Sequence, residues 1–316
     1  FKQKTAYEIP KRDWSSDVCS SDLKVRQTLE RHDLVVCLGA DLLRMSPYSE
    51  VDPLPPGMPV IHVTERVQEL GKNYATAIAL NANVKETLAA LVPLVRASRS
   101  AAQAEAAQRR LTELATRNWA AQRARAKEEV ARAANARPID PRYLMLCLAD
   151  ALPADAIVLE EALTAAPAFN SFVPMRDAGS FYGLASGGLG FALAGAVGVS
   201  LARPGRPVVA AVGDGSAMYT IQALWTMARE GLDVTVVIMA NRAYQILRGE
   251  FAGVGAGTPG RRATDMLTLD RPELDFVAIA RGMGLEAGRA DDLGEFARLF
   301  ARAMSQRGPA LIELII

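Results

Sequence analysis

One segment, residues 208–241, constrains the fold more than any other part of the chain. A run of small and β-branched apolar residues (VVAAV) leads directly into Gly213-Asp214-Gly215-Ser216. A helix-forming stretch follows, and a second apolar run (VTVVIM) ends shortly before Asn241. Uninterrupted runs of this kind are typical of strands buried on both faces of a parallel sheet. The segment therefore predicts a strand–helix–strand unit of a doubly wound α/β fold.

The glycine-rich turn combines features of a phosphate site and a metal site. Its glycines let backbone N–H groups converge, and the following helix N-terminus adds partial positive charge. Asp214 would repel a phosphate there unless a divalent cation, Mg²⁺ or Ca²⁺, takes oxygen ligands from both. Asn241 lies 27 residues later. A right-handed crossover would bring both residues to the carboxyl edge of the sheet, where open α/β sheets bind ligands.

The same residues also allow a purely structural interpretation. Asp214 could cap the helix, and Asn241 could be a turn residue at the end of a strand. The spacing from the glycine-rich turn to a strand-end Asn favours the cation–phosphate interpretation.

The rest of the chain divides by composition. Residues 1–23 are polar and aperiodic and match translated sequencing-library primers, so we interpret them as a foreign, disordered segment. Residues 24–95 contain short strands, as in part of a Rossmann-like domain. Residues 96–137 predict a helical linker, with a nucleic-acid-binding helix as the alternative. Residues 138–316 alternate between strands and helices and predict one complete α/β domain.

Individual elements follow from the apolar runs and their periodicity. The expected strands are 33–38, 59–63, 75–80, 156–159, 207–212, 234–239 and 310–316, and the expected helices are 84–91, 97–136, 189–201, 217–229, 274–282 and 293–304.

Composition excludes several classes of function. The 36 Lys and Arg balance 35 Asp and Glu, so the net charge of +1 argues against a nucleic-acid or membrane-surface partner. No apolar run reaches the ~18 residues of a membrane span. The two histidines, His32 and His62, leave little room for a His-rich metal site. Three cysteines without a CxxC pair argue against a disulfide scaffold and favour the cytoplasm.

The glycine-rich turn and the strand-end Asn together resemble the motif of thiamine-diphosphate (ThDP) enzymes. The stretch from Phe181 to Asn241 resembles the diphosphate-binding domain of the acetolactate synthase and benzoylformate decarboxylase group. The resemblance covers residues 137–316, and residues 24–95 are similar to the second half of that family's central domain. It implies an α/β fold with a doubly wound parallel sheet plus a partial Rossmann-like central domain.

The resemblance also implies a cofactor site. Asp214, Asn241 and the backbone carbonyl of Ala243 would bind Mg²⁺, and the amides of Gly215 and Ser216 would hold the diphosphate.

A second turn would contact the organic part of the cofactor. Leu189 matches an apolar wedge beneath ThDP, and the carbonyl of Gly187 would accept a hydrogen bond from the cofactor's amino group. The full cofactor-binding set implied by the resemblance is Thr164, Gly187, Leu189, Gly213, Gly215, Ser216 and Tyr244.

The implied activity is that of an acetolactate synthase-like large subunit, a ThDP- and Mg²⁺-dependent decarboxylase or carboligase. Its substrate would be a 2-oxo acid, pyruvate or an aryl analogue, in a homo-oligomer with the cofactor at the subunit interface. In this family a Glu on an N-terminal pyrimidine-binding domain activates the cofactor. That domain is absent from this sequence, so we expect no catalytic residue here and an inactive fragment. FAD binding is undecided.

Two departures from the family keep alternatives open. Ala240 replaces the first of two Asn residues in the motif, and the loop at Arg44–Tyr48 lacks the histidines of benzoylformate decarboxylase-like enzymes. The alternatives are a benzoylformate decarboxylase-like enzyme, a non-catalytic ThDP-fold subunit and a dinucleotide-binding oxidoreductase. The last is disfavoured because residues 186–195 do not fit the GxGxxG spacing.

Overall fold

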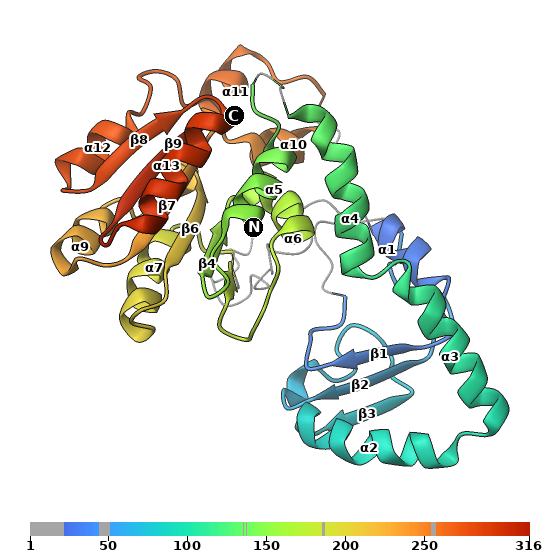
Figure 1. Ribbon diagram of the computed structural model, residues 1–316. Coiled ribbons are helices and arrows are strands. Elements are labelled where there is room, and N and C mark those ends of the chain that lie inside the picture. The colour runs from blue at the N-terminus through green and yellow to red at the C-terminus, as the bar shows by residue number, and fades with distance from the viewer. Residues whose placement is uncertain (1–21, 44–50, 135, 137, 185–186, 254–256) are drawn as a thin grey trace. The chain divides into compact units, whose positions relative to one another are not determined.

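A computed structural model describes residues 22–43, 51–134, 136, 138–184, 187–253 and 257–316. The chain divides into two compact units, Phe1–Thr116 and Arg117–Ile316, each with its own parallel sheet (Figure 1). The loop at residues 44–48 and Ser186 lie outside the described residues.

The first unit is a small three-stranded sheet with helices. Its strands are parallel in the order β1-β2-β3, and their core consists of Cys37, Leu42 and Val60 with partly buried neighbours. The helix α1 includes Asp22 and Leu23, which the sequence assigned to the foreign segment. The elements are α1 (Asp22–Leu29), β1 (Val35–Leu38), β2 (Val60–Thr64), η1 (Val67–Glu69), β3 (Ile78–Asn81), α2 (Val84–Ser98) and α3 (Ala101–Ala115).

The second unit contains a six-stranded, wholly parallel sheet in the order β5-β4-β6-β7-β9-β8. Its strands are β4 (Ile157–Glu161), β5 (Phe181–Gly183), β6 (Val208–Gly213), β7 (Val234–Ala240), β8 (Glu286–Ala290) and β9 (Ala310–Ile315). Its helices are α4 (Trp119–Val130), η2 (Ala131–Ala133), α5 (Pro141–Ala151), η3 (Leu163–Ala165), α6 (Ala166–Phe172), α7 (Phe191–Ala202), α8 (Asp214–Ala217), α9 (Ala223–Glu230), α10 (Gln245–Gly253), α11 (Arg261–Met266), α12 (Phe276–Gly282) and α13 (Leu293–Ser305).

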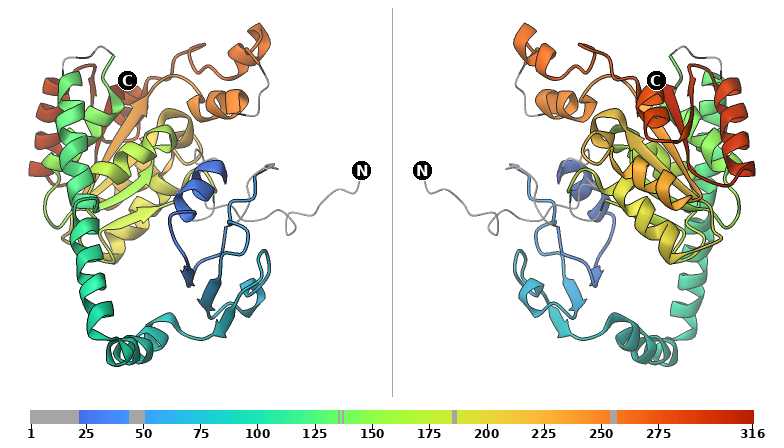
Figure 2. Two further views of the ribbon diagram at one scale, coloured as in Figure 1. Left: turned by 90° about the vertical axis from the view of Figure 1, so that its right-hand side faces the viewer. Right: turned by 90° about the vertical axis from the view of Figure 1, so that its left-hand side faces the viewer.

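Helices cover both faces of this sheet, which confirms the doubly wound arrangement (Figure 2). Successive strand residues point to opposite faces, so each central strand supplies two separate cores. Val158 and Val209 join the core beneath α5, α6 and α13, whereas Leu159 and Ala210 join the core beneath α7, α9 and α12. Burial on both faces explains why these strands are apolar without alternation.

Several predicted helices have different limits. The helix predicted over residues 84–91 continues to Ser98 as α2. The range 97–136 therefore holds the end of α2 followed by α3, α4 and η2, because Ser100 and Asn118 each cap a new helix. Residues 217–229 contain the end of α8, turns, and most of α9. The helix expected from Leu189 begins instead at Phe191, because Gly190 has a φ of +93°. The short strands β5 and β8 were not predicted.

Candidate functional site

The polar residues that follow β4 and β6 lie at the point where the order in which the chain adds strands to the sheet reverses. From β4 the chain passes outward to β5, then returns to β6 on the other side of β4. The carboxyl ends of β4 and β6 therefore flank a topological switch point, which is the usual ligand site of open α/β sheets. The predicted crossover is also present, since β6 and β7 pair in parallel with Gly213 beside Met239.

A cavity of about 350 Å³ lies at this edge. Its walls come from the segments that follow β4, β6 and β7. Seven of the predicted site residues line it: Thr164, Gly213, Asp214, Gly215, Ser216, Asn241 and Ala243. Tyr244 touches the same turn from the side, whereas Gly187 and Leu189 are not among the lining residues.

Asp214 and Asn241 occupy adjacent turns. Asp214 is 3% exposed, and its carboxylate accepts hydrogen bonds from the amides of Gly215 (2.8 Å) and Arg242 (2.6 Å). The Asn241 Oδ1 atom accepts one from the Ala243 amide at 2.9 Å. Burial raises the pKa of Asp214, and the two amide hydrogen bonds oppose that rise. The structure thus brings both oxygen-bearing side chains to one place, each also stabilising its own turn.

The oxygen atoms at this edge suit a hard cation that takes its remaining ligands from a phosphate group. An ionised carboxylate has about four acceptor sites, and the two amide bonds leave acceptor capacity on Asp214. The described residues include no group of three or more His, Cys, Asp or Glu side chains able to hold a metal ion. A cation at this edge would therefore depend on one carboxylate, one amide oxygen, one carbonyl and phosphate oxygens, a set that suits Mg²⁺.

Close packing at Gly215 explains why glycine stands there. A Cβ atom on this residue would lie 2.7 Å from Cε1 of Tyr244. The absence of a side chain lets the tyrosine ring approach the turn and leaves the Gly215 backbone on the cavity wall. Gly213 has no such neighbour, since the nearest atoms to its Cβ position are 4.0 Å away.

The turn before α7 packs against the Asp214 segment. Leu189 is 38% exposed, and Gly190 would carry a Cβ only 2.9 Å from Thr220 Cγ2 and Tyr219 Cβ. The Thr220 hydroxyl donates a hydrogen bond to the Gly190 carbonyl at 2.8 Å. The turn that contains Gly187 and Leu189 is therefore tied to the segment that follows β6.

Two buried glutamates at the end of β4 were not predicted as site residues. Glu160 accepts a hydrogen bond from the Ala162 amide at 2.7 Å, and Glu161 accepts from Gly190 and Ala192. Burial, reinforced by the neighbouring carboxyl, raises the pKa of Glu160 to about 7. Two acidic residues that end an apolar strand are the signal that could have identified them.

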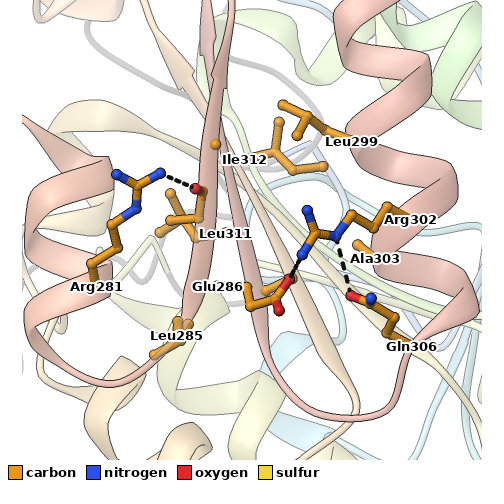
Figure 3. A pocket seen from close by; sticks show the side chains of 12 residues that line it. Arg281, Leu285, Glu286, Leu299, Arg302, Ala303, Gln306, Leu311 and Ile312 are labelled. Carbon is orange, nitrogen blue, oxygen red and sulfur yellow. Dashed lines mark hydrogen bonds and ion pairs between the residues drawn. The ribbon is translucent and has the colours of Figure 1, made fainter.

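A second hollow, of about 310 Å³, lies along the edge strand β8 between α12 and α13 (Figure 3). Arg302 there contacts Glu286 at 2.7 Å, and Arg281 donates a hydrogen bond to the Ala287 carbonyl. None of the predicted site residues lines this hollow. The Arg302–Glu286 pair is solvent-exposed, and we assign no ligand to it.

Comparison with protein-family models gives two matches. Residues 164–314 match the C-terminal TPP-binding domain of thiamine pyrophosphate enzymes, and residues 19–91 match the central domain of the same enzymes. The central-domain match begins at residue 19, so it overlaps the last five residues of the segment 1–23, interpreted as foreign from its sequence.

Individual relatives agree with these matches. A provisionally named acetolactate synthase large subunit of Mycobacterium tuberculosis is 45% identical over 52% of this chain and 32% of its own length. The benzoylformate decarboxylase of Pseudomonas aeruginosa is 34% identical over 92% of this chain and 50% of its own. The structure of a ThDP-dependent 4-hydroxybenzoylformate decarboxylase from Rhodococcus jostii superposes with a TM-score of 0.73 at 30% identity, covering 92% of this chain and 50% of that one. The chain thus spans half or less of the length of these relatives.

Proposed function

This chain belongs to the thiamine pyrophosphate enzyme family, and from that premise we propose that its carboxyl-edge cavity binds ThDP together with Mg²⁺. One observation carries the proposal: seven predicted residues from three separate strand ends line a single cavity. Asp214, Asn241 and the Ala243 carbonyl are the proposed Mg²⁺ ligands. Gly215 and Ser216 are the proposed diphosphate-binding amides at the N-terminus of α8.

We further propose that the complete enzyme acts on a 2-oxo acid as an acetolactate synthase-like subunit. Bound ThDP supplies the electron sink for loss of CO₂. This chain's residues would hold the diphosphate and metal, orient the cofactor through Leu189 and the Gly187 carbonyl, and limit access of water. The activating glutamate would come from a pyrimidine-binding domain, with homo-oligomerisation completing the site.

Calorimetric titration of ThDP and Mg²⁺ into the full chain tests the metal assignment. We expect Asp214→Ala to weaken Mg²⁺-dependent ThDP binding at least tenfold, since it removes the one carboxylate side chain among the described residues that line the cavity. Asp155→Ala is the matched control, because it removes the same charge from an exposed turn at the opposite end of β4. Undiminished binding by Asp214→Ala would disprove the assignment.

A benzoylformate decarboxylase-like activity is the second candidate. It is favoured by the Pseudomonas relative, which aligns with 92% of this chain. The two candidates differ in their products from pyruvate and benzoylformate. Co-expression of the chain with a pyrimidine-binding domain, followed by product analysis, would separate them: acetolactate from pyruvate supports the first, and benzaldehyde from benzoylformate supports the second.

A further inference from the structure

The strand β4 ends in two buried carboxyl groups that face opposite sides of the sheet. Side chains alternate along a strand, so Glu160 lies on the same face as Val158 and Glu161 on the same face as Leu159. Leu159 belongs to the core beneath α7. Glu161 therefore projects toward the start of α7, and Glu160 projects away from it.

Glu161 bonds the first turn of α7 with both of its oxygens. Oε1 accepts a hydrogen bond from the Gly190 amide and Oε2 from the Ala192 amide, each at 2.6 Å. Amides at a helix N-terminus have no partner within the helix, and the helix dipole favours a negative charge at that end. These interactions offset the cost of placing Glu161 where only 1% of it is exposed.

Gly190 is held on its other side by the segment that follows β6. The Thr220 hydroxyl donates to the Gly190 carbonyl, and Thr220 and Tyr219 leave no space for a Cβ on Gly190. Gly190 thus joins three segments. Its amide donates to Glu161 at the end of β4, its carbonyl accepts from Thr220, and it directly follows the turn that carries Gly187 and Leu189.

We infer that Glu161 is a positioning residue, whose carboxylate fixes the turn of Gly187 and Leu189 relative to the turn of Gly213–Ser216. The inference rests on the proposed function, because a ThDP molecule would have to contact both turns at once. Glu161 itself does not line the cavity. Its role is to set the spacing between two groups of binding residues.

Hydrogen–deuterium exchange of the full chain, without cofactor, tests the structural part of this inference. We expect Glu161→Ala to speed exchange of the Gly190 and Ala192 amides about tenfold, because each amide loses the hydrogen bond that protects it from exchange. Glu161→Gln retains one good acceptor and should show a smaller increase. Glu160→Gln is the matched control, because its side chain lies on the opposite face, and it should leave these two amides unchanged.

Ligand titration tests the positioning role. Glu161→Gln should weaken Mg²⁺–ThDP binding at least fivefold and leave binding of Mg²⁺ with inorganic diphosphate unchanged, because diphosphate needs only the Gly213–Ser216 turn. A merely structural defect would weaken both ligands equally, and that result would overturn the inference. Thr220→Val should give the same split by releasing the Gly190 carbonyl, and it substitutes for Glu161→Gln if that variant does not fold.

The two proposals fail in distinguishable ways. If the wild-type chain binds neither ligand but Glu161→Ala still loosens Gly190 and Ala192, the proposed function fails and the fixing of α7 by Glu161 stands. If the wild-type chain binds Mg²⁺–ThDP and Glu161→Ala leaves both amides protected, the positioning inference fails and the proposed function stands.

Discussion

The adjacent glutamates at the end of β4 show how one residue of offset changes a side chain's role. Glu161 faces α7 and bonds its first turn, whereas Glu160 bonds the Ala162 amide on its own strand end. Both are buried, and burial raises the pKa of each carboxyl group. The pKa of Glu160 rises to about 7, which places its titration near neutral pH.

Glu160 should make folding stability depend on pH. Its pKa rises from 4.5 to about 7 in the folded protein. The folded state therefore keeps a proton that the unfolded chain releases, so this contribution is complete below pH 4.5 and is lost as the pH rises through 7. The loss is on the order of 3 kcal/mol at 1.36 kcal/mol per pKa unit.

Urea unfolding at pH 5 and pH 8 measures this effect. We expect Glu160→Gln to reduce the fall in the second unit's free energy of unfolding between these pH values, leaving the part contributed by other buried carboxyl groups with a raised pKa, such as Glu161. Glu295→Gln is the control, because a hydrogen bond from Arg298 lowers the pKa of this partly exposed carboxyl group and places its titration below pH 5. An equal fall in wild type and Glu160→Gln would contradict the assigned shift.

At the scale of elements, the cavity depends on how closely neighbouring turns approach. The Gly213–Ser216 turn, where β6 passes directly into α8, can lie under Tyr244 only because Gly215 has no side chain. A methyl group there must displace the ring, and overpacking of this kind costs about 1–3 kcal/mol. Gly213 and Gly215 belong to one turn, but we expect only Gly215 to be sensitive to substitution by a larger residue.

Gly215→Ala should lower the melting temperature, whereas Gly213→Ala should be close to neutral, because its Cβ would have no neighbour nearer than 4.0 Å. Adding Tyr244→Ala should remove most of the penalty of Gly215→Ala, since it deletes the ring that the methyl group meets. Thermal unfolding followed by circular dichroism compares wild type, the three single variants Gly213→Ala, Gly215→Ala and Tyr244→Ala, and the double variant. Additive effects of the two substitutions would show that the ring is not the cause.

At the scale of the whole molecule, the two units have cores of very different size. Among the described residues, the first unit's core cluster has three buried apolar residues, while the second unit has two large cores, one on each face of its sheet. Within the described residues, no helix is long and apolar enough to span a membrane. Chains with more than one unit commonly depart from two-state unfolding.

We expect calorimetry to resolve two transitions, with the first unit unfolding at the lower temperature. Trypsin applied between the two transitions should leave a resistant fragment covering most of residues 117–316. Addition of Mg²⁺ and ThDP should raise only the upper transition, because binding stabilises the unit that holds the ligand. A single transition, with all fragments lost together, would rule out independent units.

The sequence by itself determined the strand–helix–strand pattern, the parallel α/β class and the polar edge at Asp214 and Asn241. These features are local: apolar runs specify buried strands, and strand direction brings their carboxyl ends together. It also identified the family, and it located seven residues that line one cavity.

Only the tertiary structure decided the contacts that shape this edge. The hydrogen bonds of Glu161 to Gly190 and Ala192 join residues about thirty positions apart, and the packing of Tyr244 on Gly215 has a similar separation. No local pattern encodes such pairs, because they depend on which segments the sheet order places side by side. The early start predicted for α7 failed for the same reason: Gly190 keeps a left-handed conformation between Glu161 and Thr220.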